Sequence, residues 1–355
     1  MGNCCRKRKN PNDIPNEEEI QSLKENKIIK ESKSPKRITI NLINKLKHSN
    51  RNDTIEDVIT IPNFENTIII GCRSGDIKEI SEIITENNSN IIILYSCLKR
   101  LYSLILLNQN NNKLCIGLEN QIIILRFNVD DKHKLEKELE LSLEEEGPIY
   151  SLLELKNGNI ISAGKNIILW EKNSFSKYNH IKSISIGNSR IVNLVEFPLF
   201  NTTLATQENT NKIYLFKNYR ETIDLIKITE NVTSLWYKGS AQNCSKNAMI
   251  LVGKFELNII DGKNGDVVSK YPAINRGNLL KINLKGKKNN FWVISNFSGE
   301  SFEFYEQEGN DLFYYDNFEL KSCESFGWGH KLVKINDECF AATNHYGNIF
   351  VYKIS

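Results

Sequence analysis

The chain has 355 residues, of which 40% are hydrophobic and 25% charged, a balance typical of a folded globular protein. Residues 1–50 hold 12 basic and 6 acidic residues and residues 51–355 hold 34 and 37, so the net charge of +3 comes from the N-terminal arm. This argues against a nucleic-acid binder, which usually carries a basic stripe on its folded body. The eight cysteines lack CxxC or CxxH spacing, which argues against zinc, and no apolar run approaches 18 residues. We therefore expect a protein of the reducing cytosol without a signal peptide.

The first nine residues form the sharpest local motif. Removal of Met1 exposes Gly2, whose α-amine is the acceptor in N-myristoylation, and Cys4 and Cys5 follow as acceptors for palmitate. One myristoyl chain binds membranes with an association constant of only about 10⁴ M⁻¹, so stable anchoring needs a second signal. The thiols supply one. A basic cluster supplies another, at about 1 kcal/mol for each charge near an anionic leaflet: Arg6, Lys7, Arg8 and Lys9.

This terminus resembles the dual-acylation termini of membrane-tethered signalling proteins, which implies lipidation of Gly2, Cys4 and Cys5. It departs from the myristoylation consensus at one position, where Arg6 replaces Ser or Thr. A disordered basic start and a nuclear-import patch are the alternatives. Residues 10–36 are expected to form a tether that contains a short helix over about 16–31, with Asn16 as its cap.

The remainder, 37–355, consists of a repeated β pattern. Seven segments share one plan, in which an apolar strand, a polar turn, a second apolar strand, a tight turn and a third strand follow one another. The equivalent apolar positions are spaced by 41 to 53 residues, close to the 40–45 residues of one four-stranded propeller blade. The segments begin near Asp57, Leu101, Ile149, Ile191, Val232, Leu279 and Lys331.

A fourth, outer strand follows the third strand in six of these segments, over 90–95, 134–141, 181–186, 222–228, 267–271 and 312–320. The seventh segment has none, because the chain ends at Ser355 directly after a third strand. Residues 37–43 alternate apolar and polar side chains upstream of the first segment. We expect this strand to complete the last blade and so to remove an exposed sheet edge.

These segments resemble a divergent WD40-repeat superfamily over about 90% of the chain. Their clearest member contains the hairpin pair Asn157 and Gly158 and ends in Leu169-Trp170-Glu171, where typical repeats end in Trp-Asp. A Gly-His pair opens a repeat only once, at Gly329-His330. The resemblance implies an all-β, seven-bladed WD40-like β-propeller closed by an N-terminal strand and preceded by an acylated arm over 1–36. Six or eight blades, or another repetitive all-β fold, are the alternatives.

The sequence contains no motif of a protease, hydrolase, kinase or P-loop protein, and its five histidines are dispersed. We therefore predict no catalytic residues, no metal site, no cofactor and no enzymatic activity. Four residues are candidate contacts for a protein partner, with packing in the core as the alternative. They are Tyr314 and Phe318 in an acidic and aromatic stretch, and Trp328 and His345 in loops of the last blade.

These observations predict a non-catalytic protein-interaction scaffold, held at the cytoplasmic face of a membrane by its N-terminal acyl chains and basic cluster. The expected partners are proteins and the membrane, without nucleic acid and without a small-molecule substrate. A soluble subunit of a multiprotein complex, such as a substrate receptor or trafficking assembly, is the second hypothesis. A propeller enzyme that uses the central channel is the third.

Overall fold

The computed structural model contains 28 strands and, in its described part, no helix. The described residues are 38–47, 53–62, 64–85, 89–108, 112–143, 147–175, 177–187, 189–219, 221–230, 232, 241–253, 256–272, 276–284, 289–296, 298–320, 329–344 and 346–355. The predicted tether helix over 16–31 therefore lies outside them.

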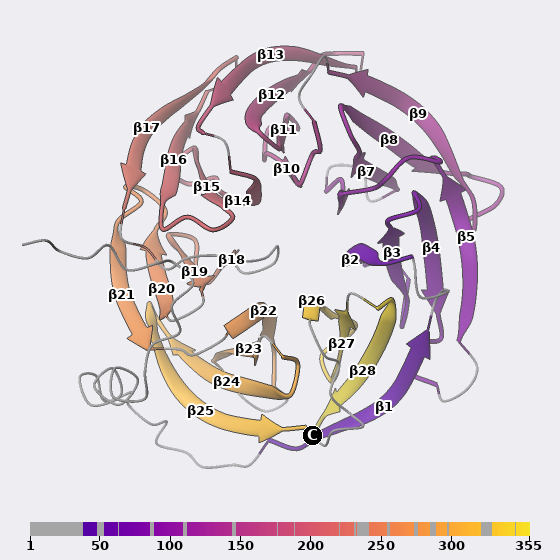
Figure 1. Cartoon of the computed structure of the whole chain (residues 1–355), viewed down its shortest axis with the longest axis vertical. Helices are drawn as coiled ribbons and strands as arrows, with labels where there is room; N and C mark the ends of the chain where they lie inside the picture. The colour runs from indigo at the N-terminus through magenta and orange to yellow at the C-terminus, as the bar shows by residue number, and fades with distance from the viewer. Residues whose placement is uncertain are drawn as a thin grey trace, which may run out of the picture.

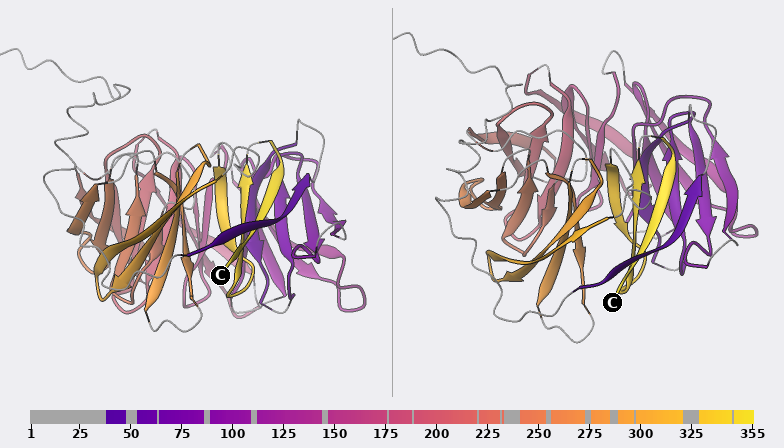
Figure 2. Two further views of the ribbon diagram at one scale, coloured as in Figure 1. Left: turned by 90° about the horizontal axis from the view of Figure 1, so that it is seen from below. Right: turned by 60° about the horizontal axis from the view of Figure 1, so that its bottom comes forward.

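The strands form seven antiparallel sheets of four, arranged as blades around a central axis. Figure 1 shows the first strand of each blade next to this axis and the fourth on the outside, and Figure 2 shows the resulting disc from its side. The predicted seven-bladed propeller is thus confirmed.

The blades are numbered in chain order, and the strands of each are given from the inside outwards. Blade one is β2 (Ile55–Thr60), β3 (Ile68–Cys72), β4 (Asp76–Ser81) and β5 (Asn90–Ser96); blade two is β6 (Ser103–Leu106), β7 (Lys113–Gly117), β8 (Gln121–Phe127) and β9 (Leu135–Ser142); blade three is β10 (Ser151–Glu154), β11 (Ile160–Ala163), β12 (Asn166–Lys172) and β13 (Tyr178–Ser185). Blade four is β14 (Ile191–Phe197), β15 (Thr202–Gln207), β16 (Ile213–Asn218) and β17 (Ile223–Thr229); blade five is β18 (Ala241–Asn243), β19 (Ala248–Val252), β20 (Glu256–Asp261) and β21 (Val267–Pro272). Blade six is β22 (Arg276–Ile282), β23 (Asn290–Asn296), β24 (Ser301–Glu308) and β25 (Asp311–Glu319); blade seven is β26 (Gly329–Lys334), β27 (Cys339–Asn344), β28 (Asn348–Ile354) and, from the N-terminus, β1 (Ile40–Lys47).

The N-terminal strand closes the ring as predicted, because β1 pairs with the last strand, β28, along its whole length. The pairing is extended by two hydrogen bonds between Thr39 and Ser355, of 2.9 and 3.0 Å. The strand continues to Lys47, beyond the predicted limit at Ile43, because a β-bulge between Leu42 and Asn44 resets the alternation of its side chains. Figures 1 and 2 show β1 on the outside of β28 and beside the end of β25.

The core lies between neighbouring blades, where apolar side chains of facing sheets interdigitate. The seam between blades six and seven is the most aromatic, since Phe302 contacts both Phe340 and Tyr352 edge-on at 5.1 Å between ring centroids. Cysteines in the second strands are fully or almost fully buried, as expected for small hydrophobic side chains: Cys72, Cys115 and Cys339.

Polar side chains of the first and second strands connect one blade to the next. The Ser103 hydroxyl of blade two donates to the Ile149 carbonyl at 2.8 Å, which gives the repeated Ser-Leu pair a structural reason. The Thr202 hydroxyl of blade four donates to the Gly262 carbonyl of blade five at 2.6 Å. These groups are buried, so each bond satisfies a carbonyl that water does not reach.

The start of blade five is described only in part. Its first strand is expected to begin near Val232, and the described inner strand of this blade is β18, over Ala241–Asn243. Residues 233–240 lie outside the described part of the chain, so the predicted start near Val232 stays a prediction.

Candidate functional site

The disc has two faces, which the connections between strands define. The upper face, as we call it, carries the turns between the second and third strands of each blade and the connections from one blade to the next. The lower face carries the turns between first and second strands and between third and fourth strands. The inner strands begin at the upper face, so the residues just before them lie around the central axis on that face, in a region that we call the upper mouth.

Two arginines and two tyrosines from three blades form a continuous row at this mouth, which we call the Arg–Tyr row. The Arg100 guanidinium lies 4.6 Å from the ring centroid of Tyr102, which contacts the Tyr150 ring edge-on at 5.3 Å. The Arg190 guanidinium lies 4.9 Å from the Tyr150 ring on the other side. A cation above an aromatic ring is stabilised by about 0.5–1 kcal/mol at an exposed site. The four side chains therefore hold one another in place.

Acidic side chains fix both ends of the Arg–Tyr row. Glu56 accepts from Arg100 at 2.9 Å and from Arg73 at 3.1 Å, and Glu208 lies 3.7 Å from Arg190. The Arg190 side chain keeps 57% of its surface exposed, against 39% for Arg100. The row therefore offers two preorganised cationic groups that face solvent next to the half-buried Tyr150 ring, whereas the Tyr102 ring is buried.

Burial raises the pKa of the Tyr150 phenol, and the Arg190 guanidinium only partly opposes this effect. The hydroxyl consequently remains protonated at neutral pH and can both donate and accept hydrogen bonds. Arginine and tyrosine dominate the strongly contributing residues of protein interfaces, because they combine large contact areas with directional polar groups.

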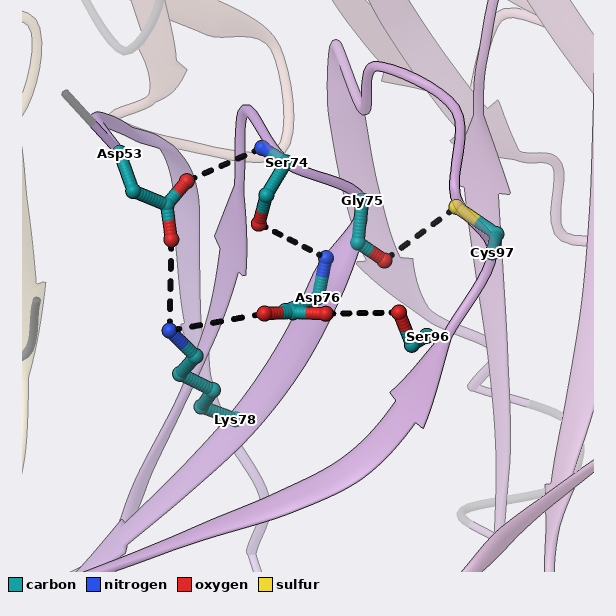
Figure 3. Close-up of polar contacts among 7 residues, drawn as sticks. All are labelled: Asp53, Ser74, Gly75, Asp76, Lys78, Ser96 and Cys97. Carbon is teal, nitrogen blue, oxygen red and sulfur yellow. Dashed lines mark hydrogen bonds and ion pairs between the residues drawn. The ribbon is translucent and has the colours of Figure 1, made fainter.

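Behind Arg73, a polar network fixes the upper turn of blade one (Figure 3). Asp53 accepts the Ser74 backbone N–H at 3.0 Å and the Lys78 ammonium at 3.3 Å, and Lys78 also lies 3.7 Å from Asp76. The Ser96 hydroxyl of the outer strand donates to Asp76 at 2.7 Å. The Lys78 side chain is only 9% exposed, so its charge is balanced by these two carboxylates instead of by water.

Burial by itself would raise the pKa of Asp53, but the Ser74 N–H and the Lys78 ammonium outweigh it and hold this pKa below its usual value. Gly75 has φ +94 in the same turn, and a Cβ there would come within 2.3 Å of the Lys99 carbonyl oxygen. The Cys97 thiol donates to the Gly75 carbonyl at 3.2 Å, and burial raises the pKa of this thiol. The network is thus a structural support for the neighbouring arginines.

Blade three has a side-chain hydrogen bond between its second and third strands. The Trp170 indole N–H donates to the Ser162 hydroxyl at 2.9 Å, so the tryptophan of Leu169-Trp170-Glu171 bonds to the second strand of its own blade. The two blades thus hold their strands together with different residues.

Two of the predicted partner-contact residues lie on the outer strand β25. Tyr314 packs edge-on against Tyr305 at 5.9 Å between centroids, and Phe318 packs against the core between blades six and seven. Both side chains are half-buried, so they contribute to packing whatever else they contact. The remaining predicted site residues lie outside the described residues: Gly2, Cys4, Cys5, Arg6, Lys7, Arg8, Lys9, Trp328 and His345.

The Arg–Tyr row was not among the predicted site residues, although the sequence contains a signal for it. Tyr102 and Tyr150 occupy the same position of their repeats, two residues before the aligned Leu. Arg100 and Arg190 also share a position, four residues before that Leu. Equivalent positions of neighbouring blades lie side by side in a propeller, so these coincidences predict a cluster.

Among the described residues, no three His, Cys, Asp or Glu side chains lie together in a way that could hold a metal ion. The same part of the chain contains no helix long and apolar enough to span a membrane. The Arg–Tyr row is a candidate site because its side chains belong to the types that protein interfaces favour.

No protein-family model matches the chain, and no curated protein matches it. Among solved structures, it is similar to Raptor from Chaetomium thermophilum, with a TM-score of 0.65 and 13% sequence identity. The similarity covers 89% of this chain and 29% of the Raptor chain, so the chain spans less than a third of that protein's length. At this identity the similarity shows the fold alone, a seven-bladed β-propeller.

Proposed function

We propose that this protein is a non-catalytic interaction scaffold that binds a protein partner with its upper mouth. The observation that carries the proposal is the Arg–Tyr row, in which four interface-forming side chains from three blades are held by one another and by Glu56 and Glu208. Preorganised side chains lose little conformational entropy on binding, and this favours affinity.

The second part of the proposal concerns location. Acyl chains on Gly2 and on Cys4 or Cys5, together with the basic cluster Arg6–Lys9, hold the scaffold at the cytoplasmic face of a membrane. Support for this part comes from the sequence motif. It is compatible with the fold, because β1 begins at the lower rim, opposite the Arg–Tyr row.

One experiment tests both parts. A biotin ligase fused to the C-terminus reports the neighbouring proteins in cells, and fractionation of the same cells reports membrane association. The double variant Tyr150→Ala/Arg190→Ala is expected to reduce labelling of the specific partners about tenfold, since interface hot spots contribute about 2 kcal/mol or more. Its membrane fraction is expected to equal that of the wild type.

The matched control is Phe175→Ala, which removes an aromatic side chain that is 83% exposed on the lower face. It is expected to leave labelling unchanged. The variants Gly2→Ala and Cys4→Ser/Cys5→Ser are expected to release the protein into the soluble fraction. Unchanged labelling in the double variant refutes the upper-face site, and unchanged membrane association in the acylation variants refutes the tether.

A further inference from the structure

The lower face contains a cavity of about 870 Å³ where the inner ends of blades three to six meet. Ligand cavities in proteins typically measure about 300–1,000 Å³, so this one has the size of a small-molecule site. Three lysines from three blades line it. Lys156 lies in the turn after β10, Lys246 in the turn after β18, and Lys281 near the end of β22.

The described lining of this cavity contains no acidic side chain. An adjacent cavity of about 660 Å³ shares Lys156 but also contains Glu171 and Glu196, so its charges are balanced. In that adjacent cavity, the Glu196 carboxylate accepts the Lys156 backbone N–H at 3.0 and 3.1 Å. The larger cavity is consequently the one with an excess of positive charge.

Lys246 and Lys281 form no ion pair with any described carboxylate. The Lys281 ammonium lies 6.0 Å from the ring centroid of the buried Trp292, and this contact leaves its hydrogen-bond donors available. An ammonium group that is not neutralised by the protein attracts an anion from solution, and the attraction increases where the surface is concave.

Neutral donors accompany the lysines. The Ser245 hydroxyl accepts two backbone N–H groups, from Asn247 at 3.2 Å and from Ala248 at 3.0 Å, so its own proton remains available to donate. The half-buried Asn290 side chain also lines the cavity. Hydroxyl and amide donors between lysines are the groups that phosphate oxygens accept from.

The cavity floor is rigid. Buried Gln307 accepts the Trp292 indole N–H at 2.9 Å and donates to the Cys244 carbonyl of blade five at 3.1 Å and to the Gly309 carbonyl at 2.7 Å. These bonds fix blades five and six relative to each other, and with them the positions of Lys246 and Lys281. A ligand would therefore meet donors that are already in place.

We propose that this cavity binds a polyphosphorylated polyol, either as a free inositol phosphate or as the headgroup of a phosphoinositide. Three lysines from separate blades match several phosphates on one small ring better than a single phosphate. No aromatic side chain lines the described cavity to stack on a base, which favours a polyol phosphate over a nucleotide. The inference is independent of the upper-face site and of N-terminal acylation.

The test uses the full-length, unacylated protein and isothermal titration with inositol hexakisphosphate, with ATP for comparison. Sedimentation with phosphatidylcholine vesicles that contain phosphatidylinositol bisphosphate tests the lipid source. The variant Lys246→Gln/Lys281→Gln is expected to lower affinity for the phosphate ligand about a hundredfold, because each of the two lost charge-assisted bonds contributes about a factor of ten. The matched control Lys263→Gln removes an exposed lysine outside the cavity on the same face and is expected to bind as the wild type does.

Binding of both probes identifies the headgroup as the shared ligand, and binding of the vesicles alone identifies the lipid as its source. The proposal is overturned if the wild type and the double variant bind with equal affinity, or if the wild type binds neither probe. If the double variant does not fold, two single variants replace it. Lys281→Arg is expected to retain binding because it keeps the charge, and Lys246→Gln is expected to weaken binding of the phosphate ligand. Tighter binding of ATP than of inositol hexakisphosphate also contradicts the proposal.

Discussion

At the residue scale, Asp57 is a buried carboxylate of the inner ring that connects several strands. Its carboxylate accepts the Val58 and Leu104 backbone N–H groups, both at 2.9 Å, and the Lys331 ammonium. These partners belong to blades one, two and seven, so a single side chain that is 6% exposed joins three inner strands. A buried carboxylate is stable only when such partners replace water.

The variant Asp57→Asn keeps the size of the side chain and removes its charge. We expect a loss of about 2–3 kcal/mol in the free energy of unfolding, since hydrogen bonds to a buried charged group contribute about that amount. Urea unfolding followed by tryptophan fluorescence measures it. Asp337→Asn is the control, because Asp337 is 74% exposed and pairs only with Lys334 in the described structure, and it is expected to change nothing measurable. Equal unfolding midpoints for the two variants would refute this role.

The repeat pattern of the sequence predicts the Arg–Tyr row only in part. The positions of Tyr102 and Tyr150 within their repeats were visible in the sequence, but their contact with each other and the contact of Tyr150 with Arg190 were not. Such contacts depend on side chains that lie about one repeat apart along the chain and are brought together only by adjacent blades. Conversely, Tyr314 and Phe318 were conspicuous as aromatic residues, yet both pack against core clusters.

At the element scale, β1 does more than complete blade seven. Its N-terminal end contacts blade six, where the Ile38 backbone N–H donates to the Asp316 carboxylate at 3.0 Å and Ile40 packs in the aromatic seam. Its middle contacts blade one through the Asn44 side chain. The strand therefore contacts both blades next to blade seven, which are blades six and one.

The link to blade one can be tested with a pair of asparagines on the same strand. The Asn44 amide donates to the Ile83 and Thr85 carbonyls at 3.0 and 3.2 Å and to the Ser89 hydroxyl at 3.2 Å. We expect Asn44→Ala to destabilise the protein by about 1 kcal/mol. Asn41→Ala removes an exposed side chain and is expected to leave the thermal midpoint unchanged. The role of Asn44 is refuted if both variants unfold at the same temperature.

The sequence predicted these elements well where the repeats were regular. The outer strands, including β5 and β21, lie within a few residues of their predicted limits. The prediction was less accurate where a local irregularity intervened. The bulge after Leu42 extends β1 beyond the expected limit. This irregularity has no periodic signal, since a bulge breaks the alternation by which strands are identified.

At the scale of the whole molecule, the ring brings together surfaces of different character. The upper mouth carries the Arg–Tyr row, the lower face carries the lysine-lined cavity, and β1 enters at the lower rim. If the N-terminal arm is acylated, it attaches to the disc on the side of this cavity. The upper mouth would then face the cytosol and remain accessible to a protein partner.

Closure of the ring by β1 is the claim on which this arrangement depends, and two truncations test it most directly. Deletion of residues 1–36 leaves β1 intact and is expected to give a folded protein with the thermal midpoint of the full chain. Deletion of residues 1–46 removes all of β1 except Lys47, exposes the edge of β28 and the apolar seams beside it, and is expected to give a protein that unfolds at a much lower temperature or aggregates. Equal thermal midpoints of the two truncated proteins would contradict closure by β1.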